Sequence, residues 1–309
     1  MSKSPIRIGT RASALALWQA NWVAQQLSAI EVKSELVPIA TRGDREAEGP
    51  IATLGIDGVF TKELQKALLD GRIDLAVHSL KDLPTEPVKG LALAAVPLRG
   101  SPFDVLISRT GQRFADLPVG ARIGTGSLRR KSQLLHARQD LQMLDIRGNV
   151  ETRLLKLKQE QFDAVVLAEV GIARLGLGDQ ITEVMPPSLI LPAVGQGALA
   201  LEIRSGDSLA REAVGQIDDP WAHQSILAER TLLATLRGGC LAPVGAWGRV
   251  NDDGRLQLSA CVLSHDGSRR LYADVLGNAA DAVPLGRQAA EQLLADGAGE
   301  LIEQSRANR

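Results

Sequence analysis

Short apolar runs alternate with longer segments of helical periodicity through the first part of the chain. We predict strands at residues 6–9, 33–40, 73–79 and 91–96, and helices at residues 13–27 and 60–71. The first helix carries an apolar stripe made of Leu15, Trp18, Trp22 and Val23. Gly71 is expected to end the second helix. Strands that alternate with helices in this way are typical of a mostly parallel sheet covered by helices, so the predicted fold class is α/β.

The same order of elements restarts after Pro102 and predicts a second α/β domain. Its expected strands cover residues 104–108, 121–124, 141–146 and 163–169, and its helices cover residues 127–138 and 149–159. The tetrapeptide Arg-Ile-Gly-Thr occurs at 7–10 and again at 122–125, each time at a strand end that precedes a serine and a helix. This weak internal repeat indicates a duplication, although four matching residues can also arise by chance.

The last part of the chain begins with a segment rich in proline and glycine, residues 182–197, which indicates a crossover back to the first domain. A long helix at 221–237 then leads to strands at 243–250, 255–264 and 269–277 and to a helical region at 280–306. We therefore predict three domains. They are an α/β domain formed by residues 1–97 with 198–217, a second α/β domain at 102–191, and a smaller α+β domain at 220–309.

The composition of the 309-residue chain is that of a globular protein, with 45% hydrophobic and 23% charged residues. The first residues lack the apolar stretch of a secretory signal, and no apolar run reaches the ~18 residues of a membrane span. We therefore expect a cytoplasmic protein that does not bind membranes. The formal net charge of -1 argues against a nucleic-acid binder. The two cysteines, Cys240 and Cys261, are too few for a disulfide scaffold and lack the spacing of a zinc site, so we expect no metal.

Positive charge is concentrated in one part of the second domain. Nine Lys or Arg residues fall there: Arg122, Arg129, Arg130, Lys131, Arg138, Arg147, Arg153, Lys156 and Lys158. Arg129 and Arg130 stand in the first turn of a predicted helix, where cations oppose the helix dipole and cost stability unless an anion is bound. Arg147 and Arg11 each follow a predicted strand at the usual ligand edge of an α/β sheet. Converging guanidinium groups suit a polyanionic small molecule, and a solvated helix face is the alternative.

Two further positions carry candidate chemistry. Asp82, beside Lys81, follows the predicted strand 73–79 and is either a general acid or base at the sheet edge or part of an ordinary surface turn. Cys240 follows two glycines in a predicted loop, and glycines allow the backbone to expose a side chain. Cys261 alternates within a predicted strand and is expected to be packed. A loop cysteine without a role is the alternative for Cys240.

Six segments taken together resemble, in order, the signature segments of the hydroxymethylbilane synthases, also called porphobilinogen deaminases. They are RIGTRASALALWQA, VHSLKDLPT, GTGSLRRKSQL, RGNVETRL, LPAVGQGALALE and LRGGCLAPVG. The resemblance implies a transferase of porphyrin and heme biosynthesis that joins four porphobilinogen molecules into the linear tetrapyrrole hydroxymethylbilane and releases ammonia. It also implies two domains similar to periplasmic binding proteins and a third domain that bears the cofactor.

The resemblance also implies roles for individual residues. A dipyrromethane cofactor, made by the enzyme from its own substrate, is attached to Cys240, and Asp82 is the catalytic residue. The resemblance assigns cofactor binding to Lys81, Asp82, Ser127, Arg129, Arg130 and Gly171 as well. It assigns substrate binding to Arg11, Ser13, Arg147, Arg153, Arg174 and Gln196.

The chemistry implied by the resemblance starts at the aminomethyl group of porphobilinogen. Asp82 assists the loss of ammonia from this group, which gives an azafulvene that the free α-position of the bound pyrrole chain attacks. The resemblance further implies a monomer whose product passes to the next enzyme of the tetrapyrrole pathway. A non-catalytic anion-binding module of the same two-lobed architecture is the alternative function, which the glycine-flanked cysteine loop disfavours.

The chain departs from the family pattern at a few positions. Thr53 and Asp57 stand in the segment 42–58, where lysines are usual, so the charge of this expected lid differs. Gly126 replaces a usual serine, and Glu169 stands where a small apolar residue is usual. Neither Gly126 nor Glu169 removes a residue to which the resemblance assigns catalysis.

Overall fold

The computed structural model describes residues 4–40, 61–239 and 242–307. The chain divides into two compact units. Unit 1 consists of Met1–Gly100 and Gly197–His223, and unit 2 consists of Ser101–Gln196 and Gln224–Arg309. After the crossover segment the chain returns to unit 1 at Gly197. The predicted domains 102–191 and 220–309 both lie in unit 2, and the boundary between them stays a prediction.

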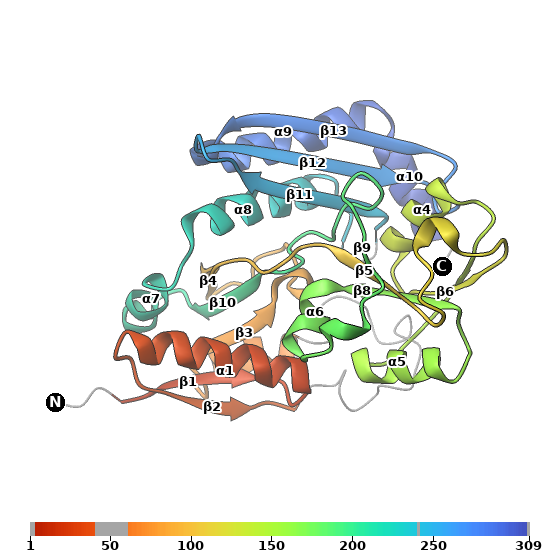
Figure 1. The fold of residues 1–309 in the computed structure, drawn as a ribbon. Coiled ribbons are helices and arrows are strands. Elements are labelled where there is room, and N and C mark those ends of the chain that lie inside the picture. Colours follow the sequence, from red (N-terminus) through yellow and green to blue (C-terminus); the bar gives the residue numbers. More distant parts are fainter. Residues whose placement is uncertain (1–3, 41–60, 240–241, 308–309) are drawn as a thin grey trace. The chain divides into compact units, whose positions relative to one another are not determined.

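Unit 1 is built on a five-stranded sheet in the order β2-β1-β3-β10-β4 (Figure 1). Its strands are β1 (Ile6–Thr10), β2 (Ser34–Pro38), β3 (Leu75–Ser79), β4 (Leu91–Ala95) and β10 (Leu199–Arg204). Strand β1 is parallel to β2 and β3, whereas β10 is antiparallel to its neighbours β3 and β4. Four strands thus share one direction, as predicted for a mostly parallel sheet, and the returning strand β10 runs against them.

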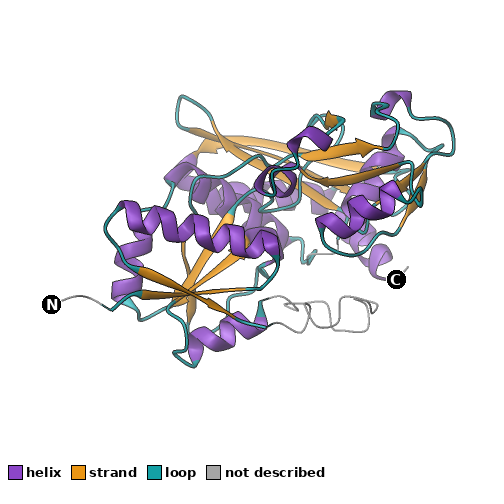
Figure 2. Cartoon of the chain, turned by 60° about the horizontal axis from the view of Figure 1, so that its bottom comes forward, coloured by secondary structure: helices purple, strands orange, loops and turns teal. Residues whose placement is uncertain are grey.

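Helices cover both faces of this sheet, as Figure 2 shows. They are α1 (Ala14–Ala29), α3 (Lys62–Leu69) and α7 (Ser208–Gly215). Because side chains alternate along a strand, Leu75 and Val77 of β3 pack with α1 and α7, while Ala76 packs with α3 on the opposite face. Gly71 has a φ of +68°, which glycine adopts without strain, so the predicted end of the second helix is confirmed.

The predicted apolar stripe of α1 is wrong in part. The residues of this helix that are buried are Ala16, Gln19, Ala20, Val23 and Leu27. Trp18 is 36% exposed, because the helix turns its small alanines toward the sheet and leaves its bulky indole at the margin. A sequence pattern ranks residues by hydrophobicity, whereas close approach of a helix to a sheet favours small side chains.

The first sheet of unit 2 has the order β7-β6-β8-β5-β9. Its elements are β5 (Asp104–Ser108), β6 (Arg122–Gly124), α4 (Leu128–Ala137), β7 (Gln142–Leu144), α5 (Val150–Lys158), β8 (Ala164–Ala168), α6 (Glu169–Arg174) and β9 (Glu183–Val184). Here β5 is the strand that runs against the others. The two Arg-Ile-Gly-Thr segments lie in β1 and β6, which hold the second place in their respective sheets. This equivalence supports the interpretation of the repeat as a duplication.

The C-terminal part of unit 2 is a smaller antiparallel sheet with helices on one face (Figure 1). Its elements are α8 (Pro220–Thr235), whose first residues up to His223 belong to unit 1, and β11 (Val244–Val250), β12 (Arg255–Leu263), β13 (Arg270–Asn278), α9 (Ala282–Ala295) and α10 (Ala298–Ala307). Helix α9 crosses α8 closely, since a Cβ at Gly286 would lie 2.4 Å from the carbonyl oxygen of Ala228. Gly297, with a φ of +98°, separates α9 from α10, so the predicted helical region is two helices.

The predicted fold class is confirmed: two α/β sheet domains and a smaller domain with an antiparallel sheet and helices. Among the described residues, no helix has the length and apolar character needed to cross a membrane.

Candidate active site

The candidate catalytic carboxylate lies on a short turn directly after a buried strand of unit 1. Strand β3 ends at Ser79, and Leu80–Asp82 forms a single turn of 3-10 helix. Leu80 is fully buried, and its amide donates a hydrogen bond of 3.0 Å to the carbonyl oxygen of Ala198. Lys81 is half-buried and Asp82 is exposed. The buried leucine thus fixes the turn while the carboxylate of Asp82 faces solvent.

A buried polar network supports this turn from inside the unit. His78 Nε2 lies 3.1 Å from Glu202 Oε2 in β10, and Gln65 Nε2 of α3 donates to Glu202 Oε1 at 3.1 Å. Gln19 Nε2 of α1 donates to Ser79 Oγ at 2.8 Å. Because buried polar groups cost free energy unless they are hydrogen-bonded, these contacts select one position for the end of β3.

Arg11 and Ser13 lie at the same sheet edge as this turn, because β1 and β3 are adjacent parallel strands and both end there. Arg11 is half-buried. Ser13 is the N-cap of α1, and its Oγ accepts a hydrogen bond of 3.4 Å from the amide of Ala16. The structure thus assembles Arg11, Lys81 and Asp82 at one edge and gives Ser13 a role in starting the helix.

The arginines predicted to bind the cofactor surround a buried carboxylate in unit 2. Asp104 begins β5 and is 1% exposed. Arg129 Nη1 donates to Asp104 Oδ2 at 2.8 Å, and Arg130 donates to Asp104 Oδ1 from Nε at 3.0 Å and from Nη2 at 2.7 Å. Both arginines are buried at the first turn of α4, which Ser127 caps through a 3.4 Å bond from the amide of Arg130. The predicted anion for these arginines is therefore present within the protein itself.

The sequence analysis missed Asp104, although an acid at the head of the apolar strand DVLIS was a visible signal. Burial alone would raise the pKa of Asp104, but Arg129 and Arg130 outweigh it and hold that pKa far below its usual value. The carboxylate is therefore charged at neutral pH. Two guanidinium groups around one carboxylate leave one positive charge in excess.

Gln196, predicted to bind substrate, also belongs to this buried cluster. Its Nε2 donates to Asp104 Oδ1 at 2.9 Å and to the carbonyl oxygen of Pro102 at 2.7 Å. Arg129 Nη1 donates in addition to the carbonyl oxygen of Leu191 at 2.6 Å. These bonds tie the crossover segment to β5 and α4 within unit 2.

Further predicted arginines add positive charge to the same unit. Arg153 in α5 donates from Nε to the carbonyl oxygen of Gly148 at 2.8 Å, and burial together with the charge of Arg130 lowers its pKa to about 10. Burial likewise lowers the pKa of Arg174 in α6 to about 10. Arg147 is exposed after β7, and Gly171 is buried in α6. Because a guanidinium group is positively charged in proteins, Arg129, Arg130 and Arg153 together exceed the single carboxylate of Asp104 by two charges.

One donor atom of this cluster makes no hydrogen bond within the described residues. Arg129 Nε is buried and has no acceptor among the described residues. A buried donor without an acceptor costs about 1–3 kcal/mol, which a carboxylate ligand can recover if it reaches the guanidinium. The residues present therefore fit a ligand that carries carboxylates.

Several predicted features lie outside the described residues: Cys240 and the segment 42–58 with Thr53 and Asp57. Cys261 is fully buried in β12, as predicted, and burial raises the pKa of its thiol to about 11. Such a thiol is a poor nucleophile at neutral pH.

Gly126 and Glu169, the two residues of unit 2 that depart from the family pattern, each contact other residues of that unit. At Gly126 a Cβ would lie 3.0 Å from the carbonyl oxygen of Ile146, so a side chain there requires a small adjustment of the backbone. Glu169 accepts a hydrogen bond from the hydroxyl of Ser101, which gives this carboxylate a partner in the same unit.

Residues 6–212 match the family described as porphobilinogen deaminase, dipyromethane cofactor binding domain, and residues 223–295 match its C-terminal domain. The chain belongs to the porphobilinogen deaminase family. It is 47% identical over 98% of its length to the porphobilinogen deaminase of Pelotomaculum thermopropionicum, of which 98% is covered. It is 48% identical over 98% of its length to that of Geobacter metallireducens, of which 95% is covered.

The predicted family, its transferase activity and its dipyrromethane cofactor are thereby confirmed, and a non-catalytic anion-binding module is not favoured. Among solved structures, a TRAP periplasmic solute binding protein from Desulfovibrio salexigens matches 69% of this chain and 72% of its own, at 11% identity and a TM-score of 0.43.

Replacing Asp104 by asparagine should destabilise the protein strongly. The Asp104→Asn variant leaves two buried guanidinium groups without a counter-charge, and breaking a buried ion pair in this way costs about 3–5 kcal/mol. Chemical denaturation of both proteins measures the difference. The matched control is Asp140→Asn, which removes the half-buried, solvent-accessible partner of Arg138 and should destabilise the protein much less. Equal effects of the two substitutions would contradict the central place given to Asp104.

Proposed function

We propose that this chain condenses porphobilinogen on a dipyrromethane primer held at Cys240, with Asp82 as the catalytic residue and with the arginines of unit 2 as carboxylate ligands. The observation that carries this proposal is that Arg129 and Arg130 pair with the single carboxylate of Asp104, while the nearby charge of Arg130 also acts on Arg153. Each pyrrole unit of the substrate bears an acetate and a propionate, so the growing chain adds negative charge with every step. An excess of fixed positive charge suits this ligand.

Arg129 and Arg130 are the residues that would hold the carboxylates of the primer, and Arg153, to which the resemblance assigns substrate binding, would add a further contact to them. When bound, dipyrromethane supplies a pyrrole with a free α-position for carbon–carbon bond formation. The arginines need no protonation change to act, because a guanidinium stays charged even when burial lowers its pKa. Asp104 fixes the orientation of two of them, so the donors are positioned before the ligand arrives.

Asp82 holds or moves a proton at the aminomethyl nitrogen of porphobilinogen and thereby assists the departure of ammonia. Its position supports this role: the carboxylate is exposed, but the turn that carries it is fixed by Leu80 and by the network behind Ser79. Lys81 and Arg11, at the same sheet edge, supply positive charge for substrate carboxylates. An exposed side chain on a rigid turn suits proton transfer, because the turn positions the donor without burying it.

The attachment of the primer at Cys240 is supported by the two cysteines' surroundings. Gly239, directly before Cys240, has a φ of +64°, a conformation that glycine adopts without strain. Cys261 is buried, and the raised pKa of its thiol disfavours nucleophilic attack. Binding of substrate by Ser13, Arg147, Arg174 and Gln196, cofactor contacts of Ser127 and Gly171, a monomeric state, transfer of product to the next pathway enzyme and a cytoplasmic location stay predictions.

The intact mass of the purified protein tests the proposal most simply. We expect an adduct with the mass of two pyrrole units on the parent and on Cys261→Ala, and none on Cys240→Ala. Peptide mapping then locates the adduct. Cys261→Ala is the matched control, since it removes the other thiol. An adduct on Cys261, or one that persists in Cys240→Ala, would overturn the attachment.

Replacing Asp82 by asparagine should lower turnover by about 10²–10⁴, the usual contribution of a positioned acid or base, while leaving the primer attached. Single-turnover release of ammonia from porphobilinogen measures the effect, and intact mass confirms the primer. The exposed Asp70→Asn in the same unit is the matched control and should turn over as the parent does. Near-normal turnover of Asp82→Asn would exclude the proposed role.

A further inference from the structure

The C-terminal sheet of unit 2 has one apolar and one polar face. Residues such as Ala246, Leu258 and Val275 face the core that the sheet forms with its helices. On the opposite face the strand register places Trp247 beside Ser259, and Cys261 beside Tyr272. Such a polar face is ordinary where it meets water, but here another part of the same unit buries Ser259 and Cys261, while Tyr272 stays exposed.

The crossover segment and α4 cover part of this polar face and border an open pocket of about 540 Å³. The amide of Ala246 donates to the carbonyl oxygen of Pro192 at 2.9 Å, which fixes the crossover segment on β11. His136 Nδ1 of α4 donates to the carbonyl oxygen of Gly267 at 2.8 Å, which fixes the opposite wall. The cavity size falls within the range of about 300–1,000 Å³ that is usual for small-molecule sites.

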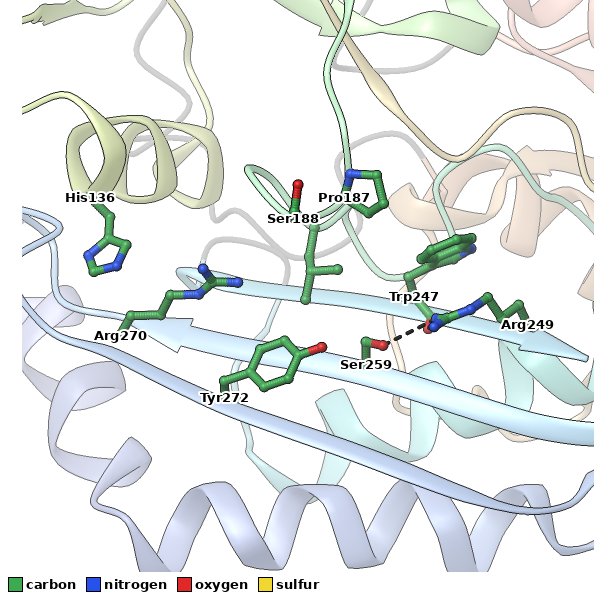
Figure 3. A pocket seen from close by; sticks show the side chains of 9 residues that line it. His136, Pro187, Ser188, Trp247, Arg249, Ser259, Arg270 and Tyr272 are labelled. Atoms are coloured by element: carbon green, nitrogen blue, oxygen red, sulfur yellow. Dashed lines mark hydrogen bonds between the residues drawn. The ribbon is translucent and has the colours of Figure 1, made fainter.

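Two arginines reach into the cavity from opposite ends, with Tyr272 between them (Figure 3). The guanidinium of Arg249 lies 4.1 Å from the ring centroid of Trp247, and its Nη1 donates to Ser259 Oγ at 3.1 Å. The guanidinium of Arg270 lies 5.4 Å from the ring centroid of Tyr272 and beside the thiol of Cys261. Aromatic rings thus hold both guanidinium groups in place.

Neither arginine forms an ion pair with another described residue, although the charge of Asp274 acts on Arg249. No carboxylate in the described part of the chain lies within ion-pair distance of Arg249 or Arg270, and Arg270 Nε is buried without an acceptor. The carboxylate of Asp274 accepts hydrogen bonds from Ser259 at 2.8 Å and from Tyr272 at 3.1 Å instead. The cavity therefore keeps one positive charge in excess of the nearby acid.

The spacing of the two arginines defines the ligand that would fit. Ser259 and Cys261, which the guanidinium groups contact, are two residues apart on β12, or about 7 Å. A ligand that pairs with both arginines therefore needs two acidic groups at least about this far apart. Between them, Trp247, Tyr272 and Leu191 offer apolar surface to a flat molecule.

We propose that this cavity binds a small aromatic molecule with carboxylates at two opposite ends. One carboxylate pairs with Arg249 and the other with Arg270, while the ring lies between Tyr272 and Leu191. None of these side chains takes part in the catalysis proposed above, so the site is a second one and the two proposals can fail separately. Its occupant lies against Leu191, whose carbonyl oxygen accepts a hydrogen bond from Arg129.

Isothermal titration calorimetry with naphthalene-2,6-dicarboxylate tests the site on the full chain. The diacid should bind about tenfold or more tightly than 2-naphthoate, which has the same ring and one carboxylate, because a charged hydrogen bond is worth about 1.5–3 kcal/mol. Arg249→Met and Arg270→Met should each reduce the affinity for the diacid to that for the monoacid. Arg287→Met is the matched control on the exposed side of α9 and should bind as the parent does.

Two further variants keep the test decisive if a methionine variant folds poorly. Arg249→Lys retains the charge and should retain most of the preference for the diacid. Arg153→Met should leave binding unchanged, since loss of binding there would place the probe in the arginine cluster of the proposed active site. Equal affinity for the two acids, or unchanged binding in both Arg249→Met and Arg270→Met, would overturn the second site.

Discussion

The buried carboxylate of Asp104 holds together the parts of unit 2 on which the proposed chemistry depends. It joins the start of β5, the first turn of α4 and the end of the crossover segment through Arg129, Arg130 and Gln196. A buried ion pair rarely adds net stability compared with apolar residues of the same shape, because desolvation offsets the attraction. Its value here is specificity of position, because this arrangement of the three segments pairs the carboxylate with both guanidinium groups.

The charge balance of this cluster connects structure to function. If Asp104 were matched by one arginine, the site would be neutral and would have little affinity for an anion. Arg129 and Arg130 pair with Asp104 and the charge of Arg130 acts on Arg153, so the cluster has an excess of positive charge that a bound carboxylate would balance. The arginines resist deprotonation, so burial cannot relieve their repulsion in the way it does for a lysine. We propose a ligand rich in carboxylates as the remaining partner.

Much of the fold could be predicted from the sequence because hydrophobic periodicity reports the faces of strands and helices directly. The strand Asp104–Ser108 was predicted with its observed bounds, and the helix that follows Arg-Ile-Gly-Thr begins after a capping serine in both sheets. The direction of β10 and β5 could not be predicted, since strand orientation depends on pairing between segments far apart in the chain. The same holds for the apolar stripe of α1, because the sheet selects small residues for close contact.

In the candidate site, too, local features could be predicted from the sequence and contacts between distant segments could not. Clustered arginines at a helix start indicated an anion, and that physical argument holds for Arg129 and Arg130. The sequence could not show that the carboxylate of Asp104 pairs with these arginines. Asp104 and Arg129 are 25 residues apart in the chain and meet only in the folded protein. Glu202, which supports the turn of Asp82 through His78, was missed for the same reason.

The central claim is that the arginine cluster is completed by the carboxylates of the bound primer. The most direct test is the difference in unfolding midpoint between primer-bearing protein and the Cys240→Ala variant, measured in the parent and again with Arg153→Met. The account predicts that the primer raises the midpoint in the parent and that Arg153→Met removes a substantial part of this rise, since each lost charged contact is worth about 1.5–3 kcal/mol. An equal rise in both backgrounds would contradict it.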